Sequence, residues 1–128
     1  MLEKQRTIRE PVTISGVGLH TGNKSNMTFK PAPEDYGIRF VRIDMEGNPE
    51  IPADIDHVID ISRGTTIAKD GAEVHTVEHV LASIVGCEID NIAVELDSNE
   101  PPVMDGSAIH YVEALKRAGA IDQEAKRD

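Results

Sequence analysis

The sequence predicts an α+β domain: a two-layer sandwich in which two helices pack on one face of a mixed β-sheet, with a small β insert. Three observations lead to this fold class. The first half is rich in β-prone residues, two later segments have the apolar spacing of helices, and a buried strand separates those segments. Strands followed by alternating strands and helices are typical of helices layered on one side of a sheet.

Most of the predicted strands lie in the first half. A stretch rich in Thr, Ile and Val runs over residues 6–15, although Pro11 limits its pairing. After a glycine-rich turn at 15–24, strands are predicted at 25–33 and at 37–44, where polar and apolar residues alternate. Residues 64–75 predict a hairpin, because β-prone residues flank Asp70-Gly71, a favoured type I′ pair.

After residue 75 the apolar spacing becomes helical. Thr76 is the predicted N-cap of this first helix and Gly86 its C-terminal stop. Apolar residues recur at i, i+3, i+4, i+7 and i+8, namely Val77, Val80, Leu81, Ile84 and Val85.

A buried strand is predicted at 91–96, and a second helix follows it between Ser107, the predicted cap, and Gly119. The tail at 122–128 is charged and aperiodic. The apolar stripe of the second helix is Ala108, Tyr111, Val112, Leu115 and Ala118.

Length and composition exclude several classes of protein. The 128 residues suit one domain, placed at 1–122, with 123–128 as the start of a linker. A net charge of −10 repels a phosphate backbone, so no nucleic-acid partner is expected. One cysteine, Cys87, excludes an internal disulfide and a cysteine-rich zinc site. Neither a signal peptide nor a transmembrane segment is predicted, so a cytoplasmic location is expected.

Residues 75–79, His-Thr-Val-Glu-His, are the strongest candidate for a chemical site. On a helical wheel His79 lies about 160–180° from the centre of the apolar stripe, so it points away from the core. Glu78 and His79 fall in the first helical turn, where the helix dipole stabilises a carboxylate and disfavours an imidazolium. An ionised Glu78 and a neutral His79 are the states that a general base and a metal ligand require.

Spacing alone leaves other interpretations open. His79 could be an ordinary surface histidine. The pattern His75-x-x-Glu78-His79 is also that of inverzincin peptidases, in which both histidines bind zinc and the glutamate activates water. However, a cap at Thr76 puts His75 outside the helix, and a catalytic zinc needs about three protein ligands. The remaining candidate ligands are Glu88, Glu95 and Glu100.

Six motifs together are more specific than any one of them. They are KQRTI at 4–8, SGVGLHTGNK at 15–24, PAPEDYGIRFVRID at 31–44, TVEH at 76–79, IDNIAVEL at 89–96 and PPVMDGSA at 101–108. In this order and spacing the chain resembles the UDP-3-O-acyl-N-acetylglucosamine deacetylase family (LpxC type), from Lys4 to about Gly119. That family contains the zinc-dependent hydrolase of lipid A biosynthesis.

The resemblance implies a role for each matching residue. Glu78 would be the general base and His79 one of three zinc ligands, whereas His75 would not bind metal. The turn that contains Leu19 and His20 would lie at the rim of the site, with Leu19 able to touch substrate and His20 organising the turn.

The resemblance implies less about two other positions. Ser62 would lie in a loop that faces the substrate. Asp105 could position a residue that binds metal or substrate, although its place close to the predicted helix cap favours a structural role.

The resemblance covers only the first of the family's two domains. The second domain supplies the other zinc ligands in a His-Lys-x-x-Asp motif, and no His-x-x-x-Asp occurs here. The expected partners are therefore a C-terminal domain of the same enzyme and an acylated UDP-sugar substrate. We expect the isolated chain to hold zinc weakly and to be inactive. A non-catalytic binding domain of the same fold is the alternative from another class.

Overall fold

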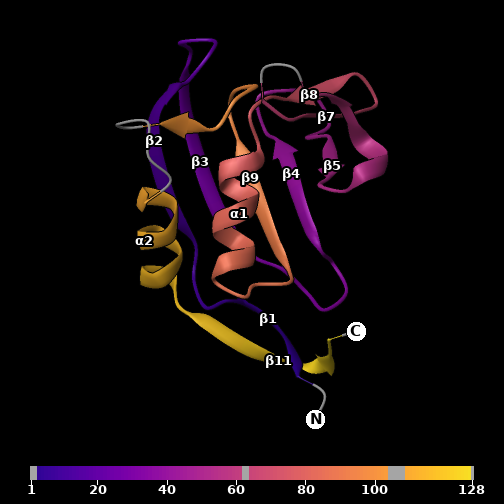
Figure 1. The fold of residues 1–128 in the computed structure, drawn as a ribbon, viewed down its shortest axis with the longest axis vertical. Coiled ribbons are helices and arrows are strands. Elements are labelled where there is room, and N and C mark those ends of the chain that lie inside the picture. The colour runs from indigo at the N-terminus through magenta and orange to yellow at the C-terminus, as the bar shows by residue number, and fades with distance from the viewer. Residues whose placement is uncertain (1–2, 62–63, 104–108, 128) are drawn as a thin grey trace.

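The computed structural model describes residues 3–61, 64–103 and 109–127. Helices α1 (Glu78–Gly86) and α2 (Ile109–Ala118) lie together over one face of a large sheet (Figure 1). The predicted fold class, a two-layer α+β sandwich with a small β insert, is confirmed. Of the described residues, the large sheet contains β10 (Pro102–Val103), β2 (Val12–Gly18), β3 (Lys24–Pro31), β9 (Ile92–Leu96), β4 (Ile38–Arg42) and β5 (Glu50–Pro52), in that order.

The large sheet is mixed, as predicted. Strands β4 and β9 pair in parallel, with Ile38 opposite Ile92, whereas the other neighbours pair antiparallel. Alternate residues of β9, namely Ile92, Val94 and Leu96, are fully buried. This period of two is that of a strand with one face against the core, and it confirms the buried strand predicted at 91–96.

Helix α1 confirms most of its predicted apolar stripe, with two corrections. Val77, Val80 and Ile84 are fully buried, but Val85 is 64% exposed because it lies about 80° from Val77 around the helix axis, at the edge of the stripe. The predicted cap is also wrong. Val77 is the N-cap without a side-chain bond, and Thr76 lies outside the helix with φ 57°.

Helix α2 ends at Ala118, and Gly119 follows with φ 80°, as predicted for a C-terminal stop. Tyr111, Leu115 and Ala118 are buried against the core. The predicted cap Ser107 and the first stripe residue Ala108 lie outside the described residues.

The two ends of the chain form a separate two-stranded ribbon. Strand β11 (Ala120–Lys126) pairs antiparallel with β1 (Lys4–Ile8), so the prediction of an aperiodic tail is wrong. The single strand predicted at 6–15 is also wrong, since β1 and β2 belong to different sheets. A charged segment can form a strand when a partner supplies the ladder of backbone bonds. The proposed domain boundary at 122 stays a prediction.

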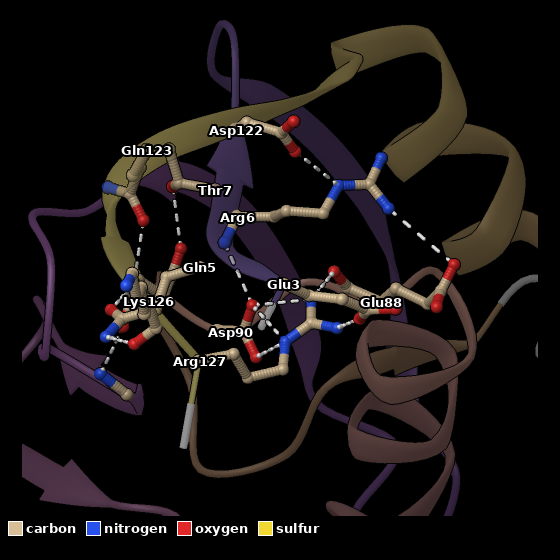
Figure 2. Close-up of polar contacts among 12 residues, drawn as sticks. Glu3, Gln5, Arg6, Thr7, Glu88, Asp90, Asp122, Gln123, Lys126 and Arg127 are labelled. Carbon is tan, nitrogen blue, oxygen red and sulfur yellow. Dashed lines mark hydrogen bonds and ion pairs between the residues drawn. The ribbon is translucent and has the colours of Figure 1, made fainter. Parts of the chain in front are cut away.

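A cluster of charged side chains joins this ribbon to the loop after α1 (Figure 2). We name it the terminal polar cluster. Arg127 donates to both carboxylate oxygens of Asp90, at 2.8–3.1 Å, and Asp90 also accepts the Arg6 backbone N–H at 2.9 Å. The members of the cluster are Glu3, Arg6, Glu88, Asp90, Asp122 and Arg127.

The small β insert consists of β6 (Val58–Asp60), β7 (Thr66–Lys69) and β8 (Ala72–Val74), preceded by a 3-10 turn at Ile55–His57. Asp70 and Gly71 both have positive φ, 52° and 84°, as the predicted type I′ hairpin turn requires. The insert brings residues 64–66 to the start of α1. Across the described ranges, neither helix is long and apolar enough to cross a membrane.

Candidate active site

The first turn of α1 presents a carboxylate beside an imidazole. Glu78 Oε2 lies 4.0 Å from His79 Nε2, and the side chains are 38% and 54% exposed, respectively. His79 therefore points away from the core, as the helical wheel predicts. Among the described residues, Glu78 is the only ionic neighbour of the His79 ring, so the ring can still accept a ligand.

Two features fix the position of this turn. The buried side chains of Val77, Val80 and Ile84 anchor α1 against the sheet. Thr65, in the insert, bonds the helix start twice: its carbonyl accepts the Val77 N–H at 3.1 Å, and its N–H donates to Glu78 Oε1 at 2.9 Å. One carboxylate oxygen of Glu78 is thus held by backbone, while the other faces His79.

Gly64 makes room for the Glu78 carboxylate. Its φ of 99° is a conformation that other residues rarely adopt, and a Cβ there would lie 3.1 Å from Glu78 Oε2 and 3.4 Å from Oε1. Glycine therefore allows the insert to approach the carboxylate closely.

Behind this turn lies a buried carboxylate, Glu100, with no exposed surface. It accepts the backbone N–H groups of His20 and Thr21, each at 3.0 Å, and the hydroxyl of Thr76. His20 Nδ1 lies 3.0 Å from both Glu100 Oε2 and Thr76 Oγ1. Burial alone raises the pKa of Glu100, but these hydrogen bonds from Thr76, Thr21 and His20 outweigh it and lower the pKa to about 2.

A cavity of about 360 Å³ opens between the 19–23 turn, the insert and the start of α1. Most of its lining residues carry polar side chains, and one of them, Gly64, adjoins the Glu78 carboxylate. A polar ligand that entered it would lie next to the candidate base. The lining residues are His20, Thr21, Asp60, Gly64, Thr66, His75 and Thr76.

The structure brings only some of the predicted site residues together. Glu78 and His79 are adjacent, and His20 lies on the wall of the neighbouring cavity. Leu19 is exposed in the turn after β2. The predicted contacts at Ser62 and Asp105 lie outside the described residues.

The inverzincin arrangement has no support in the geometry. His75 Nδ1 is 3.0 Å from Thr66 Oγ1, and Glu100, weighed as a third ligand, is buried and saturated with donors. Within residues 3–61, 64–103 and 109–127, no three His, Cys, Asp or Glu side chains converge as a metal site.

The sequence did not predict the role of Glu100. The glycine-rich turn that it holds was visible in the sequence, but its distant carboxylate partner was not.

Comparison with known proteins matches residues 5–128 to the LpxC family, described as UDP-3-O-acyl N-acetylglycosamine deacetylase. The chain belongs to this family. It is 50% identical over its whole length to a bifunctional enzyme LpxC/FabZ of Chlorobaculum tepidum. It is 44% identical, over 97% of its length, to a UDP-3-O-acyl-N-acetylglucosamine deacetylase of Myxococcus xanthus. For a protein of that name from Xanthomonas campestris the identity is 43% over 98% of the chain.

The chain spans only part of these relatives. It covers 27% of the Chlorobaculum protein, 40% of the Myxococcus protein and 42% of the Xanthomonas protein. Each of these relatives therefore has further chain that this sequence does not match.

Proposed function

We propose that this chain is the N-terminal domain of a zinc-dependent deacetylase that removes acetate from UDP-3-O-acyl-N-acetylglucosamine in lipid A biosynthesis. Membership of the LpxC family supports the reaction class, and the Myxococcus and Xanthomonas relatives carry the name of that activity. The observation that carries the proposal is the pairing of Glu78 with His79, 4.0 Å apart and partly exposed at the start of α1.

Glu78 is the proposed general base. The Thr65 N–H holds Oε1, which leaves Oε2 on the side of His79 to take a proton from an attacking water. The α1 N-terminus favours a negative carboxylate at this position. The acetamide of the substrate would lie over this pair, with acetate and a free glucosamine amine as the products.

His79 is the proposed zinc ligand, and it fits this role because its ring is exposed and beside the base. When present, zinc supplies Lewis-acid chemistry, since it makes water more acidic and polarises a carbonyl oxygen. One histidine gives an incomplete ligand set. We propose that the other ligands come from a second domain of the full-length protein.

This proposal also includes residues that would contact the substrate. Leu19 and His20 lie in the turn beside the 360 Å³ cavity, and His20 forms part of the cavity wall. We retain Ser62 as a substrate contact and Asp105 as a supporting residue on the strength of the family resemblance alone.

A non-catalytic binding domain of the same fold is the competing function. The two functions differ in one measurable quantity, the release of acetate by the full-length protein.

The test uses full-length protein and its acylated UDP-sugar substrate, with acetate release and zinc content measured together. His79→Ala is expected to lose both zinc and activity. His57→Ala is the matched control, because His57 pairs with Asp54 and does not line the cavity. Absence of acetate release from the wild-type protein would refute the deacetylase and leave the binding domain.

A second measurement tests the ligand count. Calorimetry of the isolated 128-residue chain should show no stoichiometric zinc site of sub-micromolar affinity, because a single imidazole binds zinc weakly. Tight binding would instead indicate that this chain contains a complete metal site.

A further inference from the structure

Glu100 is a fully buried carboxylate that none of the proposed chemical steps uses. An ionised carboxylate is costly to bury unless hydrogen bonds replace its hydration. Glu100 has these bonds, and within the described residues their donors come from two other segments of the chain. The turn after β2 supplies His20 and Thr21, 80 and 79 residues away, and the start of α1 supplies Thr76.

The protonation of this network follows from the chemistry of its acceptor. A carboxylate with a pKa of about 2 is ionised near neutrality and can only accept hydrogen bonds. A hydrogen on His20 Nδ1 then has an acceptor in both groups that lie 3.0 Å away. The Glu100 carboxylate accepts, and so does the Thr76 oxygen, because Thr76 donates its own hydrogen to Glu100. Nε2 is thereby left free of the carboxylate, on a side chain that is 46% exposed.

The network is packed too tightly to shift without disturbing its surroundings. A Cβ on Gly18 would collide with Glu100 Oε1 and Thr21 Oγ1. The segment that carries Glu100 is fixed on both sides: Ser25 Oγ donates to the Glu100 carbonyl at 2.7 Å, and the His75 N–H donates to the Asn99 carbonyl at 2.8 Å.

Thr76 connects this buried network to the candidate active site. Its φ of 57° is unfavourable for a β-branched residue and persists only where the surroundings hold it. Its hydroxyl bonds Glu100, and two residues later Glu78 begins α1. The direction in which the chain leaves Thr76 therefore determines where the first turn of α1 presents its side chains.

We propose that Glu100 is a positioning residue: its buried carboxylate holds Thr76 in the left-handed conformation and so orients Glu78 and His79. This inference rests on the proposed deacetylase function for its kinetic readout only. Its structural readout is independent of activity.

The kinetic test compares variants of the full-length protein. Glu100→Gln and Thr76→Val are expected to lower kcat by about 10²-fold, the cost typical of a small displacement of reacting groups, while KM changes by less than about threefold. Thr76→Ser keeps the hydroxyl and should retain wild-type kcat. Glu95→Gln is the matched control, because Glu95 lies nearby in the chain, in β9, and pairs with Lys30 instead.

The structural test measures amide hydrogen exchange in the same proteins. Loss of the Glu100–Thr76 bond should speed exchange of the Thr65 N–H, which donates to Glu78, by about tenfold or more. Exchange in β3 and β9 should not change, which separates local displacement from general loss of stability. Thr76→Val serves as the milder variant should Glu100→Gln fail to fold.

The outcomes are distinct. Faster Thr65 exchange together with reduced kcat supports the proposal. Folded variants with wild-type exchange at Thr65, or with wild-type kcat in an active enzyme, would overturn it. An inactive wild-type protein would refute the deacetylase function, and the exchange measurement would still decide the positioning role.

Discussion

Helix α1 carries charged side chains at both ends, and the two ends differ in how those charges are satisfied. At the first turn, Glu78 and His79 lie 4.0 Å apart and remain partly exposed. Beyond the last turn, Glu88 and Asp90 belong to the terminal polar cluster (Figure 2).

At the centre of the terminal polar cluster, Arg127 and Asp90 use most of their hydrogen-bonding capacity. Arg127 bonds both oxygens of Asp90, the Glu88 carbonyl and the Glu3 carboxylate. The hydrogen bonds to Asp90 are the main reason that the pKa of Arg127 lies above its ordinary value. Asp90 also accepts the backbone N–H of Arg6. Arg127 and Asp90 therefore have little capacity left to bind a ligand, although Glu3, Glu88 and Asp122 are 67–69% exposed and Arg6 Nε is buried without a hydrogen-bond partner among the described residues.

The first turn is the opposite case. One oxygen of Glu78 is held by the Thr65 N–H, while the other faces an imidazole with no further ionic contact among the described residues. A partner outside the described chain can still be bound there. The Glu78–His79 pair therefore differs from the Asp90–Arg127 pair in its unused bonding capacity, rather than in its number of charges.

The largest expected effect comes from removing the glutamate beside one end of α1 or the other. Glu78→Ala in the full-length protein should lower turnover at least about hundredfold, because a general base contributes that much or more, while zinc stays bound. Glu88→Ala, the control, should leave turnover unchanged. Steady-state kinetics and metal analysis measure both effects, and wild-type turnover in Glu78→Ala would end the assignment of the base.

The terminal polar cluster should show the reverse behaviour. Asp90→Ala removes acceptors for Arg127 and for the Arg6 backbone, so the free energy of unfolding should fall by about 2 kcal/mol. Turnover should stay within about twofold of wild type, since the cluster is at the other end of α1.

Denaturant unfolding measures this loss, with Asp122→Ala as the control. Asp122 is largely exposed and lies 3.6 Å from Arg6 Nε, so its loss should cost under about 1 kcal/mol. An activity loss in Asp90→Ala comparable to that of Glu78→Ala would contradict the division between the two ends.

The smallest expected effect tests whether close packing at Gly64 matters for the site. Gly64→Ala and Gly47→Ala both place a Cβ at positive φ, 99° and 80°, and each should cost about 1 kcal/mol of unfolding free energy. Only the alanine at 64 would meet Glu78, whereas nothing lies within 4 Å of a Cβ at 47.

Turnover therefore separates the two glycine variants. Gly64→Ala should lose activity severalfold, and Gly47→Ala should not. Equal activities at equal thermal stability would show that the insert does not constrain the Glu78 carboxylate.

Much of the fold could be predicted from local patterns. The spacing of Val77, Val80 and Ile84 predicted α1, and the Asp70-Gly71 pair predicted a hairpin that the backbone angles confirm. The outward direction of His79 also followed from the helical period. The errors came where a distant partner decided the outcome, as for β11, which forms because β1 supplies a pairing edge.

The cap of α1 shows the same limit. Thr76 has the side chain of an N-cap, but its hydroxyl bonds Glu100, so the N-cap is the next residue, Val77. Glu100 itself was one of three candidate metal ligands by sequence, and burial under the 18–22 turn removes it from that role.

Patterns along the chain were enough to predict the two helices, the buried strand at 91–96, the family and the exposed Glu78–His79 pair, because each depends on residues close in sequence. Strand β10 was not predicted. The tertiary structure alone decided that the chain ends pair and that Thr65 holds one oxygen of Glu78. It also decided that the Glu100 carboxylate, 80 residues from His20, accepts hydrogen bonds from two segments. Such contacts depend on which surfaces the packed core brings together, and no local period records that.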